Sequence, residues 1–266
     1  MSTMISKLSA TIILFLFAAV SLQAADVSAY YNAPYDDAKT VKSKLDTAGF
    51  NVLASYSPAG KSNLEVMVFT NKALTSMASK NLRGFAAVQR VIVDSSAKTV
   101  LVTNPGYWIP AFMQKDYSAG SDTAITASLK KALGALTATK DVLNSSALSN
   151  YQFMKEMPHY QDMVELKAGD ALAVKAKKKL FEVKLENGST LVGVKMSKAS
   201  ENFIDKIGTD KAILLPYTIL IENGKAYALH AKYYLAISYP LLSMDEFMKI
   251  SSIPDTIERS LKKSVK

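Results

Sequence analysis

LEVMVFTNKA, residues 64–73, aligns with TLVGVKMSKA, residues 190–199, and this internal repeat is the feature that decides the fold. Each stretch alternates apolar and polar residues, which predicts a strand, and then runs into a Lys-Ala pair that opens a helical pattern. Two further matches follow in the same order: VIVDSS (91–96) with ILIENG (219–224), and DTAITASLKK (122–131) with DTIERSLKK (255–263). The chain is therefore predicted to contain one structural unit twice.

Each copy is predicted to run strand, helix, two strands, small helix, two strands, helix. We expect the last helix of the first copy from Asp122 to about Thr137. In the second copy we expect a strand over Tyr151–Met157 and a helix from Pro158 to about Lys179. Asn-Gly pairs in ENGS (186–189) and ENGK (222–225) predict two tight hairpins.

The chain's size and composition fit two globular domains. The segment 139–150 is rich in Ser and Asn and lacks a sustained period, so it is predicted as a linker between domains at 25–138 and 151–266. The chain is 49% hydrophobic and contains no cysteine. Disulfides, thiolate nucleophiles and sulfur-ligated metals are therefore excluded, and stability must come from buried apolar area.

The N-terminal residues resemble an export signal. Lys7 precedes an apolar run at 12–20 that is too short to span a bilayer, and small residues follow at 21–25. We predict a signal peptide over 1–24, cleaved after Ala24 or Ala25, and a periplasmic protein. An uncleaved anchor is the alternative.

The protein is basic, with 32 Lys and Arg against 23 Asp and Glu and a formal charge of +9. Only Arg83, Arg90 and Arg259 are arginines, whereas nucleic-acid sites depend on the guanidinium group. No nucleic-acid partner is expected. The run KAKKK (175–179) predicts a solvated face, or alternatively a weak contact with an anionic surface.

Several short motifs carry a family resemblance. In the first half they are DAK (37–39), GFNVL (49–53), VMVFTNKA (66–73), VIVD (91–94) and TNP (103–105). In the second half they are VKMSKA (194–199), LLPYTI (214–219) and ENGKA (222–226). In this order the motifs resemble the bacterial family called domain of unknown function 302.

The resemblance implies an α+β fold of two tandem helix-grip, TBP-like domains. In each, a curved antiparallel sheet would hold a long C-terminal helix, with a small helix inserted. Single-copy members look like dimers, so the two copies are expected to pack as a pseudo-symmetric pair within a monomer. Family members commonly carry Asn-Pro before the small helix. At the corresponding positions this chain has Asn71-Lys72 and Ser197-Lys198, which is a departure from the family pattern.

Aromatic residues follow the last predicted strand of each copy. Speculative ligand-binding residues among them are Tyr107, Trp108, Phe112, Tyr233, Tyr234 and Tyr239, with Tyr117 nearby. An apolar pocket with a few phenolic hydroxyls is typical of small-ligand sites. A core lid covering the sheet is the alternative.

The two histidines are the other candidates for chemistry. His159 lies three residues before Asp162 and near Glu165, and His230 falls on a predicted strand over Ala226–Lys232. His230 could line a pocket as a proton donor or acceptor, or either histidine could be an ordinary surface residue. No nucleophile elbow, phosphate loop or dinucleotide fingerprint is present, and no metal or cofactor is expected.

The sequence thus predicts an exported, non-catalytic binding protein that presents apolar, tyrosine-lined surface to a small hydrophobic ligand or an envelope protein. One alternative is an envelope-associated enzyme that uses His230 or His159 with nearby acids and tyrosines. Another is a structural envelope protein attracted to anionic surfaces.

Overall fold

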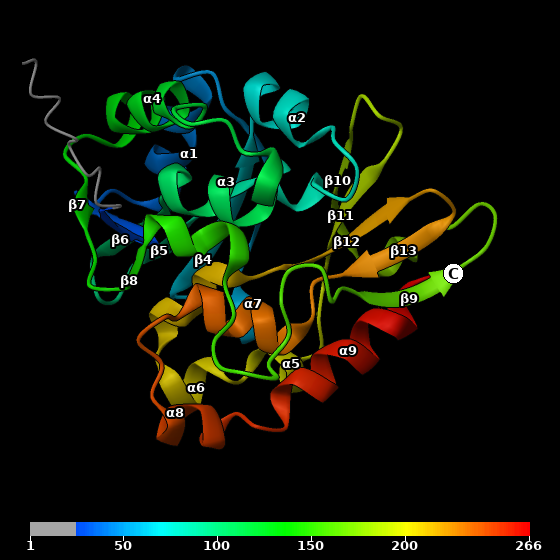
Figure 1. The fold of residues 1–266 in the computed structure, drawn as a ribbon. Helices are drawn as coiled ribbons and strands as arrows, with labels where there is room; N and C mark the ends of the chain where they lie inside the picture. The colour runs from blue at the N-terminus through cyan, green and yellow to red at the C-terminus, as the bar shows by residue number, and fades with distance from the viewer. Residues whose placement is uncertain (1–24) are drawn as a thin grey trace, which may run out of the picture.

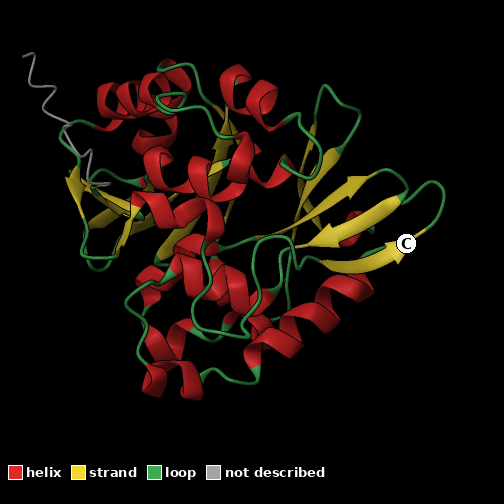
Figure 2. Cartoon of the chain, viewed as in Figure 1, coloured by secondary structure: helices red, strands yellow, loops and turns green. Residues whose placement is uncertain are grey.

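Figures 1 and 2 show a computed structural model of the protein, which describes residues 25–266. The predicted signal peptide, residues 1–24, lies outside the described residues. The rest of the chain forms helices and antiparallel sheets, so the predicted α+β class is confirmed. None of the described helices is long and apolar enough to cross a membrane.

The first half is built on a six-stranded sheet with the order β3-β4-β5-β6-β2-β7. Its strands are β2 (Tyr30–Ala33), β3 (Asn51–Tyr56), β4 (Leu64–Thr70), β5 (Gln89–Asp94), β6 (Thr99–Thr103) and β7 (Thr137–Ala138). Its helices are α1 (Ala38–Thr47), α2 (Lys72–Ala78), α3 (Pro105–Met113) and α4 (Thr123–Leu133). Short 3₁₀ turns are η1 (Pro58–Gly60), η2 (Gly84–Ala87) and η3 (Gln114–Asp116).

The second half is built on a five-stranded sheet with the order β10-β11-β12-β13-β9. Its strands are β9 (Val164–Ala168), β10 (Lys179–Lys184), β11 (Thr190–Val194), β12 (Tyr217–Glu222) and β13 (Lys225–Ala228). Its helices are α5 (Lys198–Glu201), α6 (Ile204–Ile207), α7 (Ala231–Ser238), α8 (Met244–Lys249) and α9 (Ile253–Ser264). Its 3₁₀ turns are η5 (Ala176–Lys178) and η6 (Thr209–Leu214).

The two sheets share one strand order. Strands β3, β4, β5, β6 and β2 follow one another across the first sheet as β10, β11, β12, β13 and β9 do across the second. The repeated text 64–73 forms β4 and the start of α2, and its match 190–199 forms β11 and the start of α5. Similar sequence therefore occupies the same place in each sheet.

Local signals explain where the helices begin and which side they bury. In α1, Asp37 caps the first turn by accepting a hydrogen bond from the Thr40 backbone N–H, at 3.0 Å. Val41 and Leu45 form its buried stripe, and α1 packs side by side with α4. Helix α4 ends at Leu133, earlier than predicted, because Gly134 adopts a φ of 84° that stops the helix.

The halves pack against each other reciprocally. Turn η6 of the second half packs on β4, β5 and β6 of the first sheet, and turn η2 of the first half packs on β11 and β12 of the second. Figure 1 shows the two sheets on either side of a centre that contains α3 and α7. One continuous hydrophobic core runs through both halves.

The predicted strand over Tyr151–Met157 and the predicted helix from Pro158 to about Lys179 are wrong. Residues 151–157 form turns, and the later segment contains strand β9 and turn η5. The order apolar, polar, apolar at Val164, Glu165 and Leu166 has the period of a strand, and β9 pairs with the open edge of β13. Edge pairing outweighed the weak helical pattern.

The segment 139–150, predicted as a linker, is structured. It contains β8 (Val142–Asn144), which pairs with β1 (Asp26–Ser28), and the 3₁₀ turn η4 (Ser145–Asn150). The Ala29 backbone N–H also donates to the Asp141 carbonyl, at 2.7 Å. Pairing with the start of the chain satisfies backbone groups that a free linker would leave to water.

Candidate functional site

The aromatic residues predicted to bind a ligand lie on helices α3 and α7, except Tyr239, which directly follows α7. Asn104 caps α3 and Pro105 is its first residue. An Asn-Pro pair is a common signal for the start of a helix. Tyr107, Trp108 and Tyr234 are 0%, 4% and 3% exposed. The ring centroids of Trp108 and Tyr234 are 6.2 Å apart, so aromatic rings from the two halves meet.

The hydroxyls of Tyr107 and Tyr234 are already bonded within the protein, whereas the buried Tyr233 hydroxyl has no partner among the described residues. The Tyr107 hydroxyl donates to the Ile237 carbonyl at 2.7 Å, and the Tyr234 hydroxyl donates to the Leu214 carbonyl at 2.8 Å. Burial raises the pKa of both tyrosines. These residues therefore belong to the core between the halves, a different place from the lid over one sheet that was the alternative to a ligand pocket.

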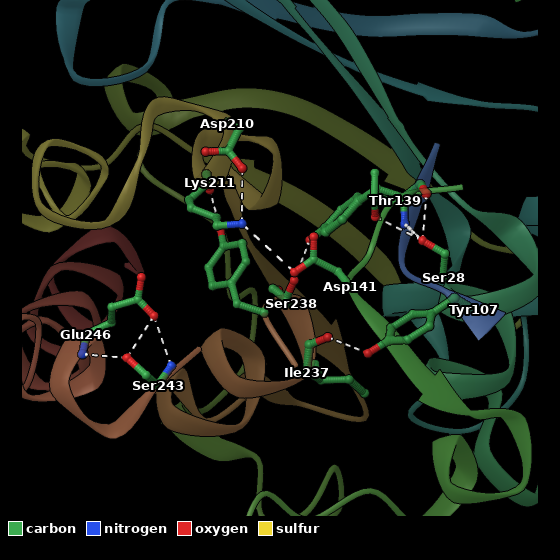
Figure 3. A network of polar contacts seen from close by, with 12 residues as sticks. Ser28, Tyr107, Thr139, Asp141, Asp210, Lys211, Ile237, Ser238, Ser243 and Glu246 are labelled. Carbon is green, nitrogen blue, oxygen red and sulfur yellow. Dashed lines mark hydrogen bonds and ion pairs between the residues drawn. The ribbon is translucent and has the colours of Figure 1, made fainter. Parts of the chain in front are cut away.

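Phe112 and Tyr233 belong to the same core, whereas Tyr239 lies beside a polar network. Phe112 packs 6.1 Å from Tyr234, and Tyr233 is 1% exposed. The Tyr239 ring lies under the Lys211 ammonium, 5.2 Å from its centroid. Figure 3 shows Lys211 directed toward Asp210, at 3.0 Å, and toward Asp141, at 3.9 Å.

His230 lies after β13, not on it, and caps helix α7. Its Nδ1 accepts a hydrogen bond from the Lys232 backbone N–H at 3.2 Å. Burial lowers its pKa, and the charge of Glu258 opposes this shift. The strand prediction failed because β13 ends at Ala228, where the chain turns into α7.

His159 lies in a turn, where its backbone N–H donates to the Asp162 carboxylate at 2.8 Å. That bond is a local turn contact of the kind aspartate commonly makes, and it uses the histidine backbone rather than the imidazole. Among residues 25–266, no group of three or more His, Asp and Glu side chains is placed to hold a metal ion.

An open cleft of about 600 Å³ lies where the α2–η2 loop and η3 meet the loop before β9. Arg83 donates from Nε to Asp116 at 2.8 Å and lies over the Tyr160 ring, 5.4 Å from its centroid. The Tyr160 hydroxyl donates to the Leu82 carbonyl at 2.7 Å, and Lys80 donates to the Asp116 carbonyl at 3.1 Å. Two of these contacts lie within the first half, and the two that involve Tyr160 join the halves.

A second hollow, which we call the α9 groove, differs from this cleft in that it is lined only by basic and hydroxyl side chains. It measures about 280 Å³ and is lined by Lys178, Ser197, Thr256, Arg259, Ser260 and Lys263. Four of these residues follow one face of α9, because positions three or four apart in a helix lie side by side. The lining consists of three cations and three hydroxyls, with no acid.

The cations of the α9 groove differ from their neighbours in their ion pairs, although the charge of Lys178 acts on the buried Glu201. Lys179 pairs with Glu182 and Lys262 pairs with Glu258, each at 2.7 Å. Within the described part of the chain, Lys178, Arg259 and Lys263 make no ion pair. The sequence showed the lysine run 175–179 but not that it faces α9.

No protein-family model matches the chain, and no curated protein is similar to it.

Proposed function

We propose that the protein is an exported, non-catalytic binding protein whose α9 groove holds an anionic group. The observation that carries this proposal is the set of three cations and three hydroxyls that face one hollow without an acid. The predicted aromatic residues are less suited to hold a ligand, because they are buried and their rings pack against each other across the halves.

The chemistry of the groove favours a phosphate-type group. Lysine and arginine bind phosphate oxygens by charge-assisted hydrogen bonds, and hydroxyls of Ser and Thr complete such sites. The volume of about 280 Å³ is at the lower end of small-molecule sites, which suits one headgroup or a small phosphorylated molecule.

The net charge supports the same conclusion at longer range. A protein of formal charge +9 attracts anionic surfaces, and each basic residue near such a surface contributes about 1 kcal/mol. Lys175 extends the cationic surface, because its ammonium donates to the Lys263 carbonyl at 2.7 Å. Export to the periplasm, which the N-terminal sequence predicts, would bring this surface to lipid headgroups.

We also propose how the two halves of the fold are related to each other. We infer that the chain is a tandem of two units related to domain of unknown function 302 that pack as a pseudo-symmetric pair in a monomer. Support comes from the shared strand order of the two sheets and from the reciprocal packing of η2 and η6. Sedimentation equilibrium of the mature chain should give the mass of one copy.

Binding to vesicles tests the groove. We expect the mature protein to sediment with phosphatidylglycerol vesicles at low salt and to dissociate from them as the salt concentration rises. It should not bind phosphatidylcholine vesicles. The triple variant K178Q, R259Q, K263Q should bind about 100-fold more weakly, since it loses about 3 kcal/mol of attraction. Calorimetry with inorganic phosphate separates capture of a free anion from binding to a membrane surface.

A matched control distinguishes the groove from net charge. Lys39, Lys131 and Lys184 are exposed, and the variant K39Q, K131Q, K184Q removes the same three charges elsewhere. It should keep most of the binding. Equal losses in both triple variants, or no binding of either probe by the wild type, would refute the groove as the site.

A further inference from the structure

The open cleft of about 600 Å³ at the α2–η2 loop lies between the two halves of the molecule. Its lining comes from residues 80–83 and 115–116 of the first half and from residues 160, 161 and 163 of the second. A cleft of this volume is large enough for a small molecule, and such sites commonly form between domains. A ligand in the cleft would contact both halves at once.

The cleft carries more positive than negative charge. Its lining includes the cations Lys80, Arg83 and Lys115 and a single acid, Asp116. Asp116 already accepts a hydrogen bond from Arg83 Nε at 2.8 Å. Lys115 is exposed and, within the described part of the chain, makes no ion pair. The cleft is therefore suited to an anion.

Arg83 is fixed in place and still has donors to offer. Asp116 holds its Nε, and the Tyr160 ring of the other half lies against the guanidinium, 5.4 Å from Cζ to the ring centroid. Within residues 25–266, Nη2 donates to no group, and Nη1 makes only a long bond of 3.4 Å to the Leu82 carbonyl. A guanidinium held in this way can donate two parallel hydrogen bonds to a carboxylate.

Apolar surface lies beside these cations. Leu82 from the first half and Met163 from the second both line the cleft and are partly buried against the hydrophobic core. An inorganic anion would use the charges of the cleft but not its apolar side chains. An organic carboxylate would use both, because its apolar part can cover Leu82 and Met163.

The loop that carries Arg83 is held by the second half without a ligand. The Leu82 backbone N–H donates to the Glu222 carboxylate on β12 at 3.0 Å, and the Leu82 carbonyl accepts from the Tyr160 hydroxyl at 2.7 Å. Leu82 adopts a φ of 55°, which is uncommon for a residue with a side chain and persists where its surroundings fix it. Because the loop is already ordered, a ligand would lose little free energy in ordering it.

We propose that the cleft between the halves binds a small organic carboxylate, with the carboxylate at Arg83 and Lys115 and the apolar part against Met163. The cleft shares no residue with the α9 groove, so neither proposal depends on the other.

Fluorine NMR of 4-fluorobenzoate, titrated with the mature protein, tests the site. We expect a Kd of about 1 mM, which is usual for a ligand of this size. The neutral 4-fluorobenzamide has a similar shape and should bind about 10-fold more weakly, because it lacks the charge. Equal affinities for the two probes, or no binding of 4-fluorobenzoate, would overturn the proposal.

Variants place the binding. R83Q should weaken 4-fluorobenzoate binding about 10-fold. K115Q removes an exposed charge that holds no other group, so it should leave the fold intact and weaken binding about 3-fold. K39Q removes the same charge from α1, and R259Q alters the α9 groove, so both should bind like the wild type. Equal losses in K115Q and K39Q, or a loss in R259Q alone, would refute the cleft as the site.

Since R83Q could loosen the contact between the halves, crystals of the wild type grown with 4-bromobenzoate well above its Kd provide a further test. We expect a bromine anomalous peak in the cleft, on the side of Met163. A peak only at another place, or no peak, would overturn the proposal.

Discussion

Glu201 shows how burial changes the chemistry of one side chain. It lies in α5, is 5% exposed, and accepts a hydrogen bond from the Ala59 backbone N–H at 2.6 Å, which joins α5 to η1 of the first half. Burial raises its pKa, while this hydrogen bond and the charge of Lys195 act in the opposite direction. The buried carboxylate is therefore tolerated because it ties the halves together, at some cost in the ionised form.

We predict a pH-dependent effect of E201Q. A carboxyl with a raised folded pKa contributes stability that is present below its unfolded pKa, about 4.3, and lost as pH rises through its folded pKa. Relative to wild type, E201Q should therefore be more stable at neutral pH than at acidic pH. Urea unfolding at several pH values measures this difference.

The control for Glu201 is E182Q. Glu182 is exposed on β10, so its substitution should shift stability by less than about 0.5 kcal/mol at every pH. A difference between E201Q and wild type that stays constant across pH would contradict the assignment.

At the scale of elements, turn η2 depends on a glycine that approaches the opposite half. A Cβ placed on Gly84 would come within 2.3 Å of Leu220 Cδ1 and 3.2 Å of Leu185 Cδ1. Leu220 lies on β12, the strand on which η2 packs. Glycine at this position lets the backbone of one half touch the sheet of the other.

G84A is therefore predicted to destabilise the protein by about 1–3 kcal/mol, because it overpacks the contact between the halves. Guanidinium unfolding followed by circular dichroism measures the loss. In a double-mutant cycle, L220A should restore space, so G84A should cost less in the L220A background than in the wild type. Additive effects would show that Gly84 and Leu220 do not interact.

At the scale of the whole molecule, the shared core predicts cooperative unfolding. Trp108 is the only tryptophan and lies 6.2 Å from Tyr234 of the other half, so its fluorescence reports on the centre of the molecule. We expect fluorescence and far-ultraviolet circular dichroism to give coincident urea transitions, because neither half can lose the core alone. Separate transitions would show that each half is stable by itself.

The elements whose formation is local were predictable from the sequence. Alternating apolar runs at 64–70 and 190–194 became β4 and β11, and the Asn-Gly turn beginning at Glu222 became the β12–β13 hairpin. Strand β9 and the pairing of β8 with β1 were not predictable, because both depend on a sheet edge made elsewhere in the chain.

The sequence by itself determined the α+β class, the strands within the repeated segments 64–73 and 190–199 and the positive charge, because periodicity and composition are local properties. Only the tertiary structure decided what the aromatic residues do: it buried Trp108 and Tyr234 against each other across the two halves. It also brought Lys178 beside Arg259, and it placed Arg83 over the ring of Tyr160. Such placements depend on which surfaces meet, and a hydrophobic pattern states only that a surface is buried, not against what.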